Sequence, residues 1–261
     1  MSRLLRVLLI LVAVGQLVMA AAFYFRWPLV VNYWPLDGTT PLTFILFAAF
    51  FAAAAASTLW PILSGHDGAL AGVGLDYMVI LAPMSLYALW LGARGEDGFL
   101  LFGAICAVGA LFGLWLFLQT RRLTLDTSIP MPMPVKVSFA VFVVALVYTS
   151  IRLFRQLPTI PWQVTPELSV IIGCLFLGAA TYFVYGLIRP SWANAAGQLA
   201  GFLAYDLVLS IPIIRLWTTV APEYQGRLIV YTIVVVYSGL VAFFYLFINK
   251  DTRIISDASP D

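Results

Sequence analysis

Charged residues, histidine and cysteine are all scarce in this sequence, and each scarcity excludes a class of function. Only 10% of the 261 residues are charged, whereas a soluble domain has about 25%. Most of the surface therefore cannot face water, and we expect it to face a lipid bilayer. The net charge is only +2 and no long basic run is present, which argues against a nucleic-acid partner.

The single histidine, His66, leaves too few nitrogen ligands for a bis-histidine haem or a multi-histidine zinc site. The two cysteines, Cys106 and Cys174, both lie in apolar runs. We interpret them as small core residues rather than as disulfide partners. We therefore expect no metal and no other cofactor.

Long apolar runs fill most of the chain. A helix needs about 20 mostly apolar residues to cross the hydrocarbon core of a membrane. Eight segments meet this requirement: 4–25, 41–63, 69–92, 99–118, 137–154, 167–188, 196–217 and 227–248. They are too long and too uniform for barrel strands. The sequence therefore predicts an all-α integral membrane protein with eight transmembrane helices, the first of which is too long for a cleaved signal peptide.

The two halves of the sequence share an ordered set of features. A Leu-Ala-Gly triplet followed by an aspartate and a proline occurs once in each half: Leu70, Ala71, Gly72, Asp76 and Pro83, then Leu199, Ala200, Gly201, Asp206 and Pro212. In each half, a Trp-bearing loop that ends in Thr-Pro follows the first helix, and a helix rich in small residues comes next. This order predicts a tandem duplication of a four-helix unit. Because four is even, the units would share one orientation, as a parallel repeat.

This interpretation divides the chain into four parts. They are the first four-helix repeat (1–118), a proline-containing cytoplasmic linker (119–136), the second four-helix repeat (137–248) and a polar C-terminal tail (249–261). The side with the termini and the linker carries eight lysines and arginines, and the other side carries six. The positive-inside rule therefore predicts that both termini are cytoplasmic.

Asp76 and Asp206 are the only acidic residues well inside an apolar run. An ionised aspartate at the centre of a transmembrane helix costs roughly 2.5–3.5 kcal/mol, so such a residue usually faces the interior of the bundle. Pro83 and Pro212 follow them on the same helices, where a proline is expected to distort the helix and free backbone carbonyls. We identify both aspartates as candidate binding residues.

Arginines near helix ends on the predicted outer side form a second candidate group. They are Arg26, Arg152, Arg155 and Arg215. We expect Arg152 and Arg215 to bind, because a cation at this level can hold an anionic headgroup or substrate. The alternative is nonspecific contact with lipid phosphates.

Three functions are compatible with these residues. The leading one is a small permease or transporter-like protein, in which Asp76 and Asp206 bind a small solute, a proton or a lipid while the halves rock. The second is a non-catalytic membrane subunit, or a lipid- or lipophile-binding scaffold, that works with partner membrane subunits. The scarcity of other polar residues in the apolar runs favours this alternative. The third is an intramembrane aspartyl protease, because two carboxylates that share a proton can activate water.

The strings Tyr205-Asp206 and Gly72-Val73-Gly74-Leu75-Asp76 resemble the Tyr-Asp and Gly-x-Gly-Asp motifs of presenilin-like proteases. The resemblance implies two catalytic aspartates. In this chain an extra residue separates Gly74 from Asp76, the order of the motifs is reversed, and no Pro-Ala-Leu follows. The sequence therefore favours a role that is not enzymatic.

Overall fold

A computed structural model describes residues 1–36, 38 and 40–253 of the chain. Within these ranges the chain is helical, and the only strand-like pairing is an isolated bridge between Pro130 and Ser191. The predicted polar tail, 249–261, lies outside the described residues from 254 onward.

Eight long helices in the described part of the chain are apolar enough to cross a membrane. They are α1 (Arg3–Tyr24), α3 (Pro41–Ser64), α4 (Leu70–Ala93), α5 (Phe99–Thr120), α6 (Met133–Phe154), α7 (Pro166–Ile188), α8 (Trp192–Leu216) and α9 (Pro222–Phe243). Each predicted segment corresponds to one of these helices. Large apolar side chains on their outer faces, such as Val108 of α5 and Ile233 of α9, are more than half exposed, as expected for contact with lipid. The chain is therefore an all-α, integral, multi-pass membrane protein.

Three helices, α6, α8 and α9, begin four or five residues earlier than the sequence predicted, and α9 begins at Pro222. Helix α6 begins at Met133, inside the segment predicted as linker, because Pro134 occupies its first turn, where a missing N–H breaks no hydrogen bond. Helix α8 begins at Trp192, where the Ser191 hydroxyl accepts a hydrogen bond from the Asn194 N–H at 3.4 Å. A serine cap of this kind satisfies one of the free donors at a helix start.

Three short elements complete the fold. Helix α2 (Pro28–Val31) follows α1, a 3₁₀ turn (Asp67–Ala69) leads into α4, and a π-helical turn (Phe244–Ile248) extends α9. Prolines expected to distort helices do not end them, since α4 continues through Pro83 and α8 through Pro212. Each of these prolines nevertheless removes one backbone hydrogen bond from its helix.

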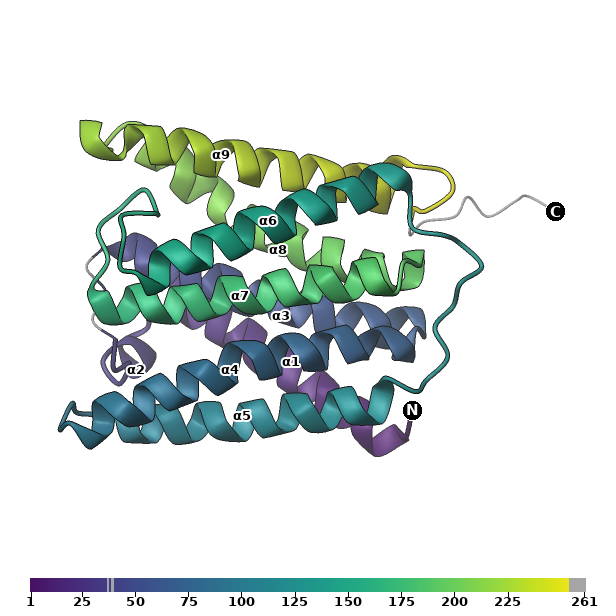
Figure 1. The fold of residues 1–261 in the computed structure, drawn as a ribbon, viewed down its shortest axis with the longest axis horizontal. Helices are drawn as coiled ribbons and strands as arrows, with labels where there is room; N and C mark the ends of the chain where they lie inside the picture. Colours follow the sequence, from purple (N-terminus) through teal and green to yellow (C-terminus); the bar gives the residue numbers. More distant parts are fainter. Residues whose placement is uncertain (37, 39, 254–261) are drawn as a thin grey trace.

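The long helices form two layers of four (Figure 1). One layer has the order α1, α3, α8, α9, and the other has the order α5, α4, α7, α6, with each helix packed on the next. The chain crosses between the layers after α3 and again after α7. Each layer therefore contains two helices from the first half of the chain and two from the second.

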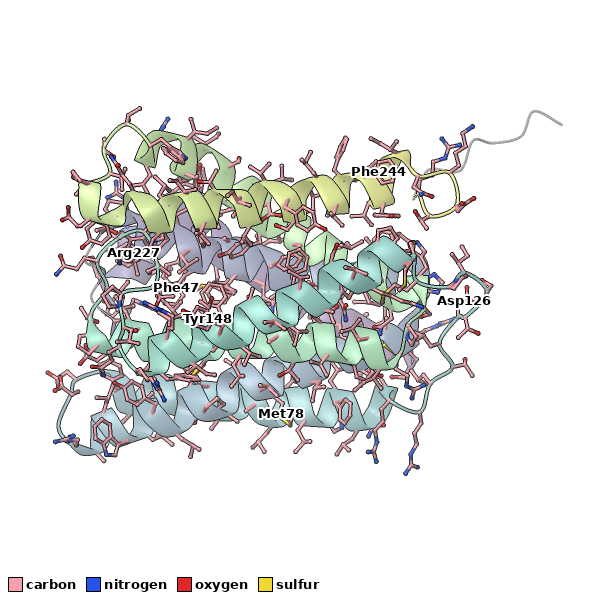
Figure 2. All side chains as sticks on the ribbon, turned by 45° about the horizontal axis from the view of Figure 1, so that its top comes forward. Phe47, Met78, Asp126, Tyr148, Arg227 and Phe244 are labelled. Atoms are coloured by element: carbon pink, nitrogen blue, oxygen red, sulfur yellow. The ribbon has the colours of Figure 1, made fainter. Side chains whose placement is uncertain are left out.

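The two ends of the bundle are formed by different connections. The N-terminus, the α5–α6 connection and the start of α8 lie at one end, and α2 and the α6–α7 loop lie at the other. Figure 2 places Asp126 and Arg227 at these opposite ends. The two ends are called the linker end and the α2 end below.

Helices α4 and α5 approach closely where Gly74 faces Gly113. A Cβ atom on Gly74 would lie 2.8 Å from the carbonyl oxygen of Gly113, and a Cβ atom on Gly113 would lie 2.8 Å from that of Gly74. Both distances are too short for a methyl group, so glycine at both positions permits this approach. Small residues serve the same purpose in other membrane helix pairs, where lipid supplies no hydrophobic drive.

Candidate binding cavity

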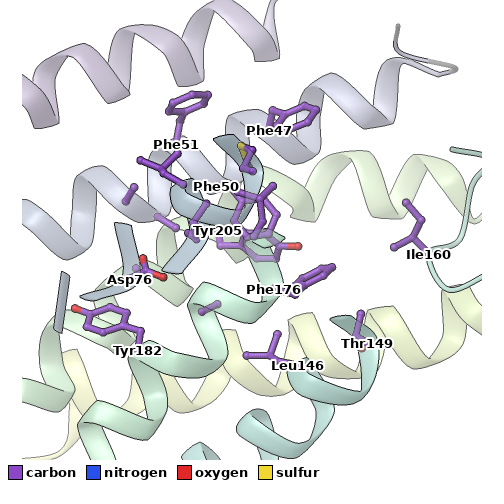
Figure 3. A pocket seen from close by; sticks show the side chains of 18 of the residues that line it. Phe47, Phe50, Phe51, Asp76, Leu146, Thr149, Ile160, Phe176, Tyr182 and Tyr205 are labelled. Carbon is purple, nitrogen blue, oxygen red and sulfur yellow. The ribbon is translucent and has the colours of Figure 1, made fainter. Parts of the chain in front are cut away.

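A cavity of about 1200 Å³ is lined by residues from all eight long helices, and therefore from both layers. Its wall is mainly aromatic and aliphatic. Figure 3 shows Tyr205 and Phe176 between Asp76 on one side and Ile160 on the other. A cavity of this size and composition fits a hydrophobic molecule that is held by a few polar groups.

Asp76 projects from α4 into this cavity, beside Tyr182 of α7 (Figure 3). Its Oδ1 atom is buried and has no hydrogen-bond partner among the described residues. Gly178 of α7 provides the space for the carboxyl group, since a Cβ atom there would lie 2.9 Å from Oδ1. The Asp76 carboxyl group therefore has acceptor capacity that no described residue uses.

Asp206 of α8 also lines the cavity and is only 5% exposed. Its Oδ2 atom accepts a hydrogen bond of 2.8 Å from the Ser238 hydroxyl of α9. Its Oδ1 atom has no partner within the described chain. One carboxyl oxygen is thus fixed by α9, and the other is free to accept a hydrogen bond.

The two aspartates share the cavity but contact different helices, and no hydrogen bond joins their carboxyl groups in the described structure. Asp76 lies four positions after Gly72, whereas Asp206 lies five positions after Gly201. At about 3.6 residues per turn, one extra residue rotates the side chain by roughly 100° around the helix. A protease dyad needs two carboxyl groups in contact, so this arrangement does not favour the protease alternative.

Five buried polar atoms of cavity-lining residues, those of the aspartates included, have no hydrogen-bond partner among the described residues. The atoms concerned are Asp76 Oδ1, Asp206 Oδ1, Gln16 Oε1, Gln198 Oε1 and Trp34 Nε1. Four of these five atoms are oxygen acceptors. A buried polar atom without a partner costs about 1–3 kcal/mol, so the wall favours a molecule that brings hydrogen-bond donors, such as a hydroxyl or an amine.

Tyrosine hydroxyls connect the helices around the cavity. The Tyr77 hydroxyl accepts a hydrogen bond of 2.7 Å from the Gln16 amide and lies 2.6 Å from the Thr58 hydroxyl. These contacts join α4 to α1 and α3. In the second half, the hydroxyls of Tyr205 and Tyr231 lie 2.6 Å apart and join α8 to α9.

The structure separates the two arginines that the sequence singled out. Arg152 lines the cavity at the α2 end, whereas Arg215 is exposed and is not part of the wall. Arg227, which the sequence analysis counted only for orientation, also lines the cavity. The sequence could have indicated Arg227, because placing a charged residue in the second turn of a transmembrane helix costs free energy.

No family model, curated protein or solved structure matches the chain. The chain is an integral, multi-pass membrane protein. Its cavity is therefore interpreted from its own residues.

Proposed function

We propose that the protein is a small permease-like carrier, which binds a lipophilic molecule in the cavity and holds that molecule's hydroxyl or amine group with Asp76 and Asp206. The observation that carries this proposal is that both aspartates, each with an unpartnered oxygen, line one large apolar cavity. The apolar wall accommodates a hydrophobic body, and the free oxygens select for a donor group. A purely hydrophilic solute would leave most of the wall without favourable contacts.

We also propose that the chain is a parallel tandem duplication, with repeats at 1–118 and 137–248 joined by a linker at 119–136. The packing order supports this division. The repeat pairs α1 with α6, α3 with α7, α4 with α8 and α5 with α9. Exchanging each helix for its counterpart converts one layer, α1-α3-α8-α9, into the other, α6-α7-α4-α5.

Individual contacts support the same division. Gly201 of α8 lies against Ser57 of α3, and Gly72 of α4 lies against Tyr182 of α7. Gly72 and Gly201 are counterparts in the repeated triplet. Ser57 and Tyr182 are counterparts as well, because they lie equally far along the chain from the two Thr-Pro pairs that begin α3 and α7. A twofold axis parallel to the helices would produce this exchange of counterparts. Two halves related by such an axis can rock to give alternating access to a central site.

The proposed function is tested by the molecules that remain bound to the protein. We would purify it gently from its native membrane and identify bound small molecules and proteins by mass spectrometry. We expect one lipophilic molecule at close to one per chain in the wild type, and at least a tenfold loss in the Asp76→Asn/Asp206→Asn variant. Glu96→Gln, a change at an exposed loop carboxylate, is the matched control and should retain the molecule.

Two outcomes would contradict the proposal. Equal amounts of the molecule in all three proteins would remove the aspartates from its binding. Stoichiometric partner proteins without any bound small molecule would favour the assembly-subunit alternative and would make the aspartates packing residues.

A further inference from the structure

Helices α6 and α9 touch near the linker end and diverge toward the α2 end (Figure 1). Near the linker end the hydroxyls of Ser138 and Tyr237 lie 2.8 Å apart. Toward the α2 end, Tyr148 of α6 and Val230 of α9 both line the cavity, yet they are 60% and 63% exposed. The cavity is therefore open sideways between α6 and α9, in the direction of the lipid.

Two arginines flank this opening. Arg152 lies near the end of α6 and Arg227 near the start of α9, and both are half-buried in the cavity wall. Arg152 Nη2 donates a hydrogen bond of 2.8 Å to the Pro158 carbonyl oxygen, and Arg227 Nη1 donates one of 3.2 Å to the Ile160 carbonyl oxygen. Because these two carbonyls are only two residues apart in the α6–α7 loop, the two guanidinium groups converge on the same short segment of the loop.

Neither arginine forms an ion pair with a carboxylate among the described residues. The two ion pairs found among the described residues both use Asp67, at the opposite end of the bundle. Arg152 also bonds to the hydroxyls of Tyr148 and Thr159, and Arg227 bonds to the Glu223 carbonyl. A guanidinium has more N–H donors than these bonds occupy. The remaining donors of both groups are suited to a carboxylate or a phosphate.

Helix α9 sets the separation between Arg227 and the level of Asp206. Arg227 precedes Ser238 by eleven residues on α9, which is about 16 Å at a rise of about 1.5 Å per residue. The Ser238 hydroxyl is bonded to Asp206, and the wall between these levels includes the apolar side chains of Val234 and Val235. A molecule that meets both sites has an anionic group at one end and a long apolar chain.

We propose that the cavity binds a single-chain anionic amphiphile that enters between α6 and α9. Its carboxylate or phosphate group is held by Arg152 and Arg227, and its chain extends into the cavity toward Asp206, where a donor group near the far end meets the free carboxyl oxygen. This inference rests on the proposed function, because it names the class of molecule that the same cavity takes.

The test uses three probes of matched chain length and the full-length protein in phosphatidylcholine nanodiscs. The probes are radiolabelled ω-hydroxydodecanoate, dodecanoate, which lacks the hydroxyl, and dodecanediol, which lacks the carboxylate. Binding is measured by equilibrium dialysis, and the amount taken up by empty nanodiscs is subtracted. Arg152→Gln/Arg227→Gln should weaken binding of both acids at least tenfold and leave the diol unchanged. Arg215→Gln, a change at an exposed arginine outside the cavity wall, should change nothing.

Different results overturn the inference and the proposed function. An equal loss of the acids and the diol in the arginine variant would mean that the arginines only hold the loop, which overturns the inference and leaves the proposed function intact. If Asp206→Asn left the binding of the diol unchanged, the role of the aspartate in the proposed function would be contradicted. No binding of any probe to the wild type would contradict both.

Competitors distinguish the sources of the anionic group. Unlabelled ω-hydroxydodecanoate should displace the labelled acid, whereas acetate and inorganic phosphate at the same concentration should not. Displacement by acetate or phosphate would define a site for small anions and overturn the inference. Displacement by phosphatidylglycerol in the nanodisc, equal to that by the single-chain acid, would assign the arginines to ordinary membrane lipid and would overturn it as well.

Discussion

Tyr77 joins three helices at one hydroxyl group. It accepts a hydrogen bond from the Gln16 amide of α1 and contacts the buried Thr58 hydroxyl of α3. Tyr77→Phe removes the acceptor of the Gln16 amide and leaves the Thr58 hydroxyl only its bond to the Ala54 carbonyl oxygen. The loss of such a hydrogen bond costs about 0.5–1.5 kcal/mol. We expect a lower unfolding temperature in mild detergent, measured by the change in intrinsic fluorescence. Tyr33→Phe, at a side chain that is 84% exposed, should match the wild type, and equal stability of the two variants would contradict the role of Tyr77.

The sequence predicted those residues of the cavity wall that stand out by their polarity within an apolar helix. Asp76 and Asp206 stand out because charge is expensive inside an apolar helix, and the structure places both in the cavity wall. The pairing of Arg152 with Arg227 was not predictable, because it depends on the path of the α6–α7 loop between two helices distant in sequence. Arg215 looked equivalent to Arg152 by its position at a helix end, yet it is exposed and is not part of the cavity wall.

At the scale of helices, the packing of α4 against α5 depends on the facing glycines. In Gly113→Ala the new methyl group would lie within 2.8 Å of the α4 backbone, so the two helices must separate. Overpacking of this kind costs about 1–3 kcal/mol. We expect a lower unfolding temperature and a distorted cavity wall. Gly15→Ala is the matched control, because nothing lies within 4 Å of its Cβ position.

The control substitution should change the stability in the opposite direction. Alanine is about 1 kcal/mol more favourable than glycine inside a helix, so Gly15→Ala should be neutral or slightly stabilising. If Gly113→Ala and Gly15→Ala had the same unfolding temperature, the close approach of α4 and α5 would be contradicted.

Helix positions were predictable because hydropathy is a local property of the sequence. All eight predicted segments overlap a long helix of the described chain. The two-layer order was not predictable, since helices such as α4 and α5 are apolar on nearly every face and do not mark the side that packs. Helix α2 and the 3₁₀ turn before α4 escaped prediction because each is too short to carry a periodic signal.

For the whole molecule, an even number of crossings places the N-terminus and the end of α9 on one side of the membrane. The positive-inside rule predicts that this side, with its eight lysines and arginines, is cytoplasmic. We expect green fluorescent protein fused after residue 253 to fluoresce in bacterial cells. Alkaline phosphatase fused in the α4–α5 loop, after Glu96, should be active. The reverse pattern would contradict the orientation and would place Arg152 and Arg227 on the cytoplasmic side.

Transport through the cavity by means of its aspartates would appear as flux in proteoliposomes. Asp206→Asn nearly preserves the shape of the side chain and keeps an acceptor for the Ser238 hydroxyl, so the protein should still fold. Uptake of the molecule that copurifies with the wild type is measured against protein-free liposomes, with Glu96→Gln as the control variant. We predict uptake by the wild type and Glu96→Gln and its loss in Asp206→Asn, and unchanged uptake in Asp206→Asn would contradict the account.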